Sequence, residues 1–243
     1  LKTIEDKTAP LMIWIHAPLT SCRQFTPTLN ASFRNAQGLV SSLAGFTDVL
    51  VLSGHWHNNH TGTVPGSAAI REHNLGAISG SLWYNVKGFN GGTEYSSGTD
   101  GSPVGYGIYE ISGRSIRWSY KGCELAADRA FTAYDMNKQP YKDKSVANEI
   151  LVNVWGGWDA AWKVEVLENN TPLTVTRQAR KDPGYLTYVE TVYKPSGDDM
   201  SKSAASAQST PHMFSAVTAA ADSPVLIRVT DRFGKVFTQQ LRE

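Results

Sequence analysis

Two short apolar segments on either side of an amphipathic one constrain the fold of this chain more than any other feature. Residues 11–15 (LMIWI) and 48–52 (DVLVL) are runs of strand length that are rich in apolar side chains. Between them, apolar residues recur at positions 33, 36, 40 and 43, which is the spacing of one helix face. A strand, a helix and a second strand in this order predict a βαβ unit with two parallel strands and a right-handed crossover.

The rest of the chain consists of short β-prone segments separated by Gly, Asn and Asp. Residues 106–111 and 115–120 flank a Ser-Gly-Arg turn and predict a hairpin. Further segments of strand length toward the C-terminus predict an antiparallel β-sandwich. These segments are residues 149–154, 162–167, 174–177, 186–193, 225–230 and 235–241.

The two patterns together predict an α/β part followed by an all-β part. We place an α/β domain over residues 1–125 and a β-sandwich domain over residues 126–243, with the boundary near the polar stretch 135–148. Residues 194–211 are rich in Ser, Ala and Asp and almost lack apolar side chains, which predicts a mobile loop within the second domain.

Charge and composition exclude several classes of partner. The chain has 23 basic and 22 acidic side chains, scattered along 243 residues, so we expect no nucleic-acid-binding patch and no attraction to an anionic membrane. Its apolar runs are far shorter than the roughly 18 residues of a membrane-spanning helix, so we expect no membrane span. The two cysteines, Cys22 and Cys123, are too few for a disulfide scaffold, and whether they pair is left open.

Three histidines follow the two predicted parallel strands directly. His16 comes after the first strand, and His55 and His57 come after the second, behind Gly54. The carboxyl ends of parallel strands meet at one edge of a sheet, where ligands bind in open α/β folds, and imidazole is a common metal ligand. An extended His-x-His pair points to opposite sides, so it suits two metals or a bent loop. A glycine at position 54 would allow a close approach of backbone and metal. The alternative is that each histidine is an ordinary hydrogen-bonded loop residue.

These histidine motifs resemble those of a known family. Residues 14–19 (WIHAPL) and 51–58 (VLSGHWHN) are similar to the last two metal motifs of calcineurin-like metallophosphoesterases, where a strand-end His precedes a G-H-x-H block. Residues 72–80 (EHNLGAISG) and 100–106 (DGSPVGY) resemble the continuation in a bacterial branch with an additional C-terminal domain, as do the tryptophan-rich stretch after position 154 and TDRFG at 230–234. The resemblance spans nearly the whole chain.

The resemblance implies a dinuclear site that hydrolyses phosphoesters. Two divalent metals, commonly manganese, iron or zinc, would be held by five motifs and would activate a water. Carried over to this sequence, His16 and His55 would bind one metal and His57 the other. The family resemblance also leads us to expect an extracytoplasmic location. Residues that we expect to line the site are Asn58, His60 and His73.

Three of the five family motifs do not occur in this sequence. We find no Asp-x-His, no Gly-Asp-x-x-Asp and no Gly-Asn-His, so the carboxylates that would neutralise the metals are missing. The chain also opens at Leu1 without a methionine or a leader pattern. We therefore expect the C-terminal portion of a longer phosphoesterase, which does not hydrolyse phosphoesters by itself.

Two other functions stay open at this point. His16, His55 and His57 would form a mononuclear three-histidine zinc site if both members of the His-x-His pair turned inward. Alternatively, the cluster of Trp155, Trp158 and Trp162 would make the β-sandwich a carbohydrate-binding module if these rings were exposed, whereas buried rings would simply fill the core.

Overall fold

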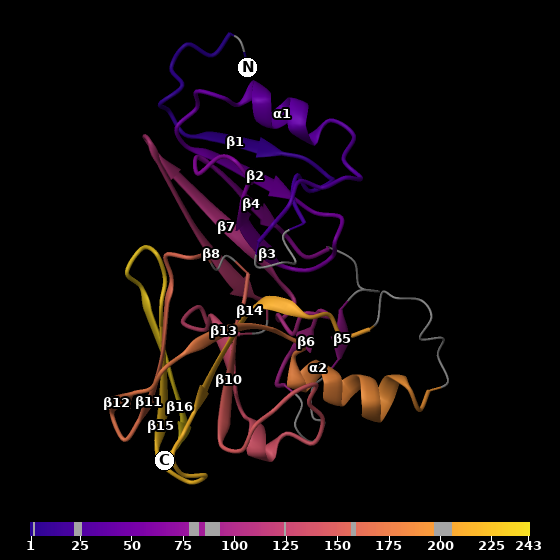
Figure 1. The fold of residues 1–243 in the computed structure, drawn as a ribbon, viewed down its shortest axis with the longest axis vertical. Helices are drawn as coiled ribbons and strands as arrows, with labels where there is room; N and C mark the ends of the chain where they lie inside the picture. Colours follow the sequence, from indigo (N-terminus) through magenta and orange to yellow (C-terminus); the bar gives the residue numbers. More distant parts are fainter. Residues whose placement is uncertain are drawn as a thin grey trace.

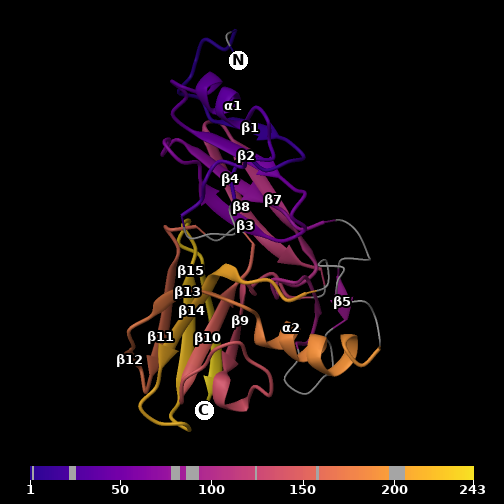
Figure 2. The same cartoon turned by 45° about the vertical axis from the view of Figure 1, so that its right-hand side comes forward.

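The computed structural model describes residues 1, 3–21, 26–77, 83–85, 93–123, 125–156, 159–196 and 206–243. Figure 1 shows an upper body, which contains α1, the sheet of β1 to β4 and the hairpin β7–β8, and a lower body that contains the strands from β9 onward. The turned view in Figure 2 shows the same division. β-Strands are the predominant secondary structure of the described residues and form several sheets that are largely antiparallel, with few helices.

The upper sheet is mainly parallel. Its strand order is β1-β2-β4-β3, in which β1, β2 and β4 run parallel and β3 is antiparallel to β4. The predicted strand, helix and strand are present as β1, α1 and β2. The elements are β1 (Leu11–Trp14), α1 (Ala36–Ser42), β2 (Val49–Ser53), β3 (His60–Thr63) and β4 (Ile70–Asn74).

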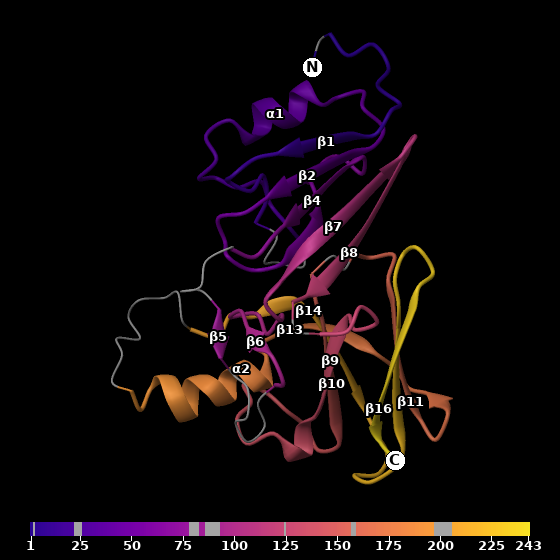
Figure 3. The same ribbon diagram turned by 180° about the vertical axis from the view of Figure 1, so that it is seen from behind.

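Strand β2 is buried on both faces, which explains its unbroken apolar sequence. Val49 and Val51 belong to the cluster that includes Ala36 of α1, whereas Leu50 and Leu52 pack with Ile116 and Trp118 of the hairpin. Figures 1 and 3 show this long hairpin extending from the lower body along the upper sheet. Its strands are β7 (Gly105–Ser112) and β8 (Ser115–Gly122), as the sequence predicts.

The lower body is a sandwich of two four-stranded antiparallel sheets. Their strand orders are β13-β14-β10-β9 and β12-β11-β15-β16, and one apolar cluster lies between them. The small pair β5–β6 lies near α2 in this body (Figure 1). The strands are β5 (Tyr84–Asn85), β6 (Ser96–Ser97), β9 (Phe131–Asp135), β10 (Glu149–Val154), β11 (Lys163–Glu168), β12 (Thr171–Pro172), β13 (Thr176–Arg180), β14 (Thr210–Val217), β15 (Val225–Thr230) and β16 (Val236–Arg242), and a short 3-10 helix covers Met136–Lys138.

One predicted strand is wrong. Residues 186–193 are helical, because α2 (Pro183–Tyr188) continues directly into a π-helix (Val189–Tyr193). Asp182 caps the start of α2, since its Oδ1 accepts a hydrogen bond of 2.9 Å from the backbone N–H of Tyr185. The proline after the cap favours the first helical turn, so the Asp-Pro pair was the signal for a helix start.

Several strands were not identified individually from the sequence, namely β3, β4, β6, β9, β12 and β14. Of these, β4, β9 and β14 are predominantly buried and lie at or next to the centre of their sheets. Strand β14 starts at Thr210, so the last two positions of the predicted loop 194–211 are buried strand instead. Residues 197–205 of that loop lie outside the described part of the chain. The described residues include no helix with the length and hydropathy to span a bilayer.

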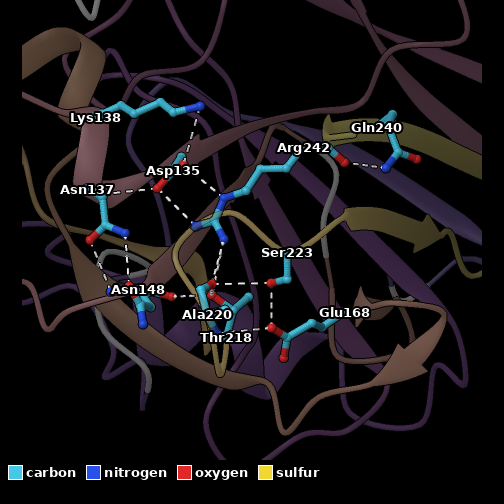
Figure 4. A network of polar contacts seen from close by, with 10 residues as sticks. All are labelled: Asp135, Asn137, Lys138, Asn148, Glu168, Thr218, Ala220, Ser223, Gln240 and Arg242. Atoms are coloured by element: carbon cyan, nitrogen blue, oxygen red, sulfur yellow. Dashed lines mark hydrogen bonds and ion pairs between the residues drawn. The ribbon is translucent and has the colours of Figure 1, made fainter.

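A buried ion pair connects the C-terminal strand to the other sheet of the sandwich (Figure 4). Arg242 Nε donates to Asp135 Oδ2 at 2.8 Å and Nη2 donates to Oδ1 at 3.0 Å, and both side chains are at most 5% exposed. Arg242 Nη1 also donates to Thr218 Oγ1 at 3.2 Å, which leaves the guanidinium well satisfied. Such a two-bond arrangement depends on the planar fork of arginine.

We expect Arg242→Gln to destabilise the protein strongly, because it leaves the Asp135 carboxylate buried without its cation. The expected loss of unfolding free energy is about 3–5 kcal/mol, measured by urea denaturation at neutral pH. Arg228→Gln is the matched control, since this arginine of the neighbouring strand is 39% exposed and its pair with Glu165 spans 4.0 Å. An equal loss in both variants would contradict a special role for the buried pair.

Candidate metal centre

The parallel ladder continues past the ends of β1 and β2 and brings the predicted ligands to one edge. Ile15 N donates to Leu52 O at 3.0 Å, and Gly54 N donates to His16 O at 3.0 Å. The backbones of His16 and Gly54 are therefore neighbours, and His55 follows at once. This edge is the carboxyl end of the parallel strands, as the sequence predicts.

Two of the three predicted ligands lie side by side. His55 Nδ1 and His16 Nε2 are 3.2 Å apart, and the rings meet edge to face with centroids 5.2 Å apart. Two nitrogens that bind one ion at about 2.0–2.1 Å stand about 2.9–3.4 Å apart in octahedral or tetrahedral geometry. The 3.2 Å separation lies in this range, and it is equally the distance of a hydrogen bond between the two rings, both of which are exposed.

The backbone of the His-x-His loop is bent. His55 has φ +71° and His57 has φ +60°, both in the left-handed region that residues with a Cβ seldom adopt. Each such residue costs on the order of 1–3 kcal/mol, and this kind of strain is concentrated at functional sites. A Cβ on Gly54 would lie 3.8 Å from His16 O, an ordinary contact, so close approach does not explain this glycine.

His57 is exposed, but it does not complete a cluster with the other two. Within the described ranges, no three or more His, Cys, Asp or Glu side chains are grouped so that they could hold a metal ion. The structure thus brings together His16 and His55, while the assignment of all three histidines as ligands stays a prediction.

Asn58 and His60 are buried between the two bodies. Asn58 Oδ1 accepts a hydrogen bond of 2.8 Å from Thr99 Oγ1. The His60 ring lies 6.2 Å from the ring of His212, which belongs to β14 of the lower body. Both side chains therefore contribute to packing between the upper and lower bodies, and their predicted place in the lining of the metal site is not tested.

His73 is buried against the hairpin. Its Nδ1 is 3.0 Å from Tyr109 Oη, and its ring meets Trp118 edge to face at 4.9 Å. Burial, together with the charges of Arg71 and Arg232, lowers the pKa of His73 to about 3. The imidazole is therefore neutral at physiological pH.

A buried glutamate positions the loop after His16. Glu72 of β4 accepts hydrogen bonds from Leu19 N at 2.7 Å, Thr20 N at 2.8 Å and Thr20 Oγ1 at 2.5 Å. Its side chain is fully buried, and this burial raises the pKa of the carboxyl group despite the three donors. The sequence analysis did not assign this role to Glu72. An acidic residue inside a buried strand nevertheless indicates a side chain that accepts hydrogen bonds within the structure.

A second buried polar group was also missed. His212 Nδ1 is 2.9 Å from Asn153 Oδ1, and His212 Nε2 is 3.6 Å from Asp100 Oδ2. Asp100 and Asn153 are also joined, since Asn153 Nδ2 donates to Asp100 O at 3.0 Å. These contacts fix the loop around Asp100 to the central strands of the sandwich, and Asp100 Oδ2 also accepts a hydrogen bond of 3.3 Å from the backbone N–H of Asn59, two residues after His57.

Two of the three clustered tryptophans, Trp155 and Trp162, pack against the protein interior. Trp155 is 1% exposed, and its Nε1 donates to Thr132 Oγ1 at 3.0 Å. Trp162 stacks on Phe237 at the side of the sandwich core, with 6.4 Å between the ring centroids. Trp158 lies outside the described residues, and so does Cys22, which leaves its pairing with Cys123 undescribed.

The described residues form a β-sandwich that is joined to a small, mainly parallel sheet. Histidines lie at the carboxyl edge of this sheet. A family model described as C terminal of Calcineurin-like phosphoesterase matches residues 72–237. The match covers well over half of the chain, so the chain belongs to this family. The matched region begins within β4 and therefore excludes His16, His55 and His57. No curated protein and no solved structure matches the chain.

We expect His73 to make the protein less stable in acid. Its native pKa of about 3 lies below the ordinary value of 6.5, so only the unfolded chain binds this proton between those limits. The unfolding free energy therefore falls as the pH falls below 6.5, by up to about 1.4 kcal/mol per pH unit. Urea unfolding at several pH values between 7 and 4.5 should show a shallower slope for His73→Gln.

Tyr109→Phe is the control for this measurement. It removes the hydroxyl partner of His73 but keeps the buried imidazole, so the protein should lose stability and keep the pH slope. An unchanged slope in His73→Gln would show that His73 is not the group responsible.

Proposed function

We propose that this chain is the C-terminal part of a dinuclear metal-dependent phosphoesterase. In this proposal His16 and His55 bind one metal ion and His57 binds the other, and the upper body is part of a metallophosphoesterase α/β sandwich. The observation that carries the proposal is the 3.2 Å separation of the His16 and His55 nitrogens at the carboxyl edge of two parallel strands. Membership of the calcineurin-like phosphoesterase family supports the interpretation of this edge as part of a metal site.

In this proposal the metal ligands come from two parts of a longer polypeptide, because this chain offers histidine nitrogens but lacks the acidic motifs. When bound, two metal ions polarise a phosphoryl group and supply an activated water. This chain contributes neutral nitrogen ligands, and the missing Asp-x-His, Gly-Asp-x-x-Asp and Gly-Asn-His motifs would come from another stretch of polypeptide. Carboxylate oxygens from those motifs would balance the charge of the metals, which imidazoles cannot do.

The chain's own residues hold the predicted metal ligands in place and orient them. The left-handed backbone at His55 and His57 turns the two rings away from the alternation of an extended strand. Glu72 of β4 binds the backbone of Leu19 and Thr20, three and four residues after His16, and so fixes the loop after β1 to β4. Both features hold the predicted ligands in place before an ion binds, which reduces the entropy lost on binding.

Metal affinity tests the ligand assignment directly. We expect the purified chain to bind Zn²⁺ through His16 and His55, and His16→Ala or His55→Ala to weaken this binding by at least about tenfold in calorimetric titrations. Trp14→Ala is the control, because Trp14 is 67% exposed on the same edge but offers no ligand. Equal affinity of wild-type protein and His55→Ala would refute the assignment.

The activity of the isolated chain tests the other half of the proposal. With p-nitrophenyl phosphate and bis-p-nitrophenyl phosphate in Mn²⁺ or Zn²⁺, we expect no turnover above background, because the acidic ligands are missing. Turnover that His55→Ala abolishes would show instead that the chain is an enzyme by itself. If His57→Ala also abolished zinc binding, that result would favour a mononuclear three-histidine site.

A further inference from the structure

A pocket lined by three arginines lies between the two bodies, apart from the histidine edge. It has a volume of about 240 Å³ and is lined by parts of β3 and β4 of the upper sheet and by three segments of the lower body. We call it the guanidinium pocket and define it by its polar lining residues, which are Thr61, Thr63, Arg71, His73, Asp159, Arg177 and Arg232.

Two of the arginines are held by one indole ring. The Arg71 guanidinium carbon is 5.1 Å from the Trp118 ring centroid, and that of Arg232 is 5.0 Å from it. Both distances are within the roughly 6 Å at which the quadrupole of a ring attracts a cation. The same indole therefore attracts two of the three guanidiniums that line the pocket.

The carboxylates near these two arginines occupy only part of their donors. Arg71 Nη2 binds Asp48 Oδ1, and Arg232 Nε lies 3.0 Å from Asp159 Oδ2. Within the described residues, the other nitrogens of Arg71 and Arg232 have no protein acceptor. Several N–H groups of this wall are therefore available to a bound anion.

The third arginine approaches from the sandwich. Arg177 of β13 donates from Nε to Pro211 O at 2.5 Å, which fixes its side chain beside the pocket. Burial lowers the pKa of Arg177 to about 10, so the group is still charged at neutral pH but has lost much of its hydration. A partly desolvated cation interacts strongly with an anion that enters the pocket.

The net charge of the lining residues and the positions of the three arginines both favour a phosphate over a carboxylate as the ligand. Asp159 is the single acidic residue in the lining, so three guanidiniums leave an excess of two positive charges. The donors come from β4, from β13 and from the turn before β16, which suits a tetrahedral ion with three or more acceptor oxygens. The volume is slightly below the usual range for drug-sized ligands, which favours a small molecule.

We propose that the guanidinium pocket binds phosphate, free or as the phosphate group of a small molecule, through Arg71, Arg177 and Arg232. This site requires neither metal ions nor His16, His55 and His57, so it is independent of the function proposed above.

Calorimetric titration of the chain with inorganic phosphate tests the proposal, in low-salt buffer with EDTA so that no metal-bound phosphate contributes. We expect one site per chain, and Arg71→Gln, Arg177→Gln and Arg232→Gln should each weaken binding by about tenfold or more. Arg114→Gln is the control, because this arginine of the β7–β8 turn is 58% exposed and lies outside the pocket. Arg177→Gln leaves the contacts of Arg71 and Arg232 with Trp118 in place, so it tests the site even if the other two variants fail to fold.

Three results of the titrations with these arginine variants and with acetate would overturn the proposal. These are no binding at millimolar phosphate, equal weakening by Arg114→Gln, or acetate binding as tight as phosphate binding, which would make the pocket a carboxylate site. His55→Ala separates the two proposals, since it should leave phosphate affinity unchanged while it weakens zinc binding. If His55→Ala abolished phosphate binding, the anion would bind at the histidine edge and the pocket proposal would be wrong.

Discussion

The burial of β2 on both faces is the constraint on which the rest of the molecule depends. Every residue of Val49–Ser53 is buried, with α1 packed against one face and the β7–β8 hairpin against the other. Each large apolar side chain buried in this way contributes about 1.5–3 kcal/mol. Because β1 and β4 both pair with β2 in parallel register, this strand also determines where the carboxyl edge lies and which residues reach it.

Buried polar groups join the two bodies, and all depend on partners from the other body. Asn58 and His60 of the upper body meet Thr99 and His212, and the backbone N–H of Asn59 donates to the buried carboxylate of Asp100. A buried polar group without a partner costs about 1–3 kcal/mol, so each such contact penalises any arrangement in which the bodies separate. The guanidinium pocket lies at the same junction, and an anion bound there would add to this coupling by mass action.

Sequence reasoning identified the features that rest on local periodicity. The strand, helix and strand of residues 11–54, the hairpin and most sandwich strands follow from apolar spacing and turn residues, and the structure contains them. It also placed His16 and His55 correctly beside each other, because parallel strands align their ends. It could not identify β14, whose Thr-Pro-His-Met sequence has little β signal and is stabilised by strands far away in the chain. The guanidinium pocket was invisible for the same reason, since its arginines are about 55 and 106 residues apart along the chain.

Strand β4 shows why both candidate sites depend on one register. Successive side chains point to opposite faces of a strand, so Arg71 and His73 share one face and Glu72 takes the other. In the parallel pairing with β2, Arg71 and His73 lie beside Leu50 and Leu52 on the hairpin side, and Glu72 lies beside Val51. A slip of one residue would exchange these faces. It would move the Arg71 guanidinium away from Trp118 and the Glu72 carboxylate away from Leu19 and Thr20, so the pocket wall on β4 and the anchored loop after His16 would be lost together.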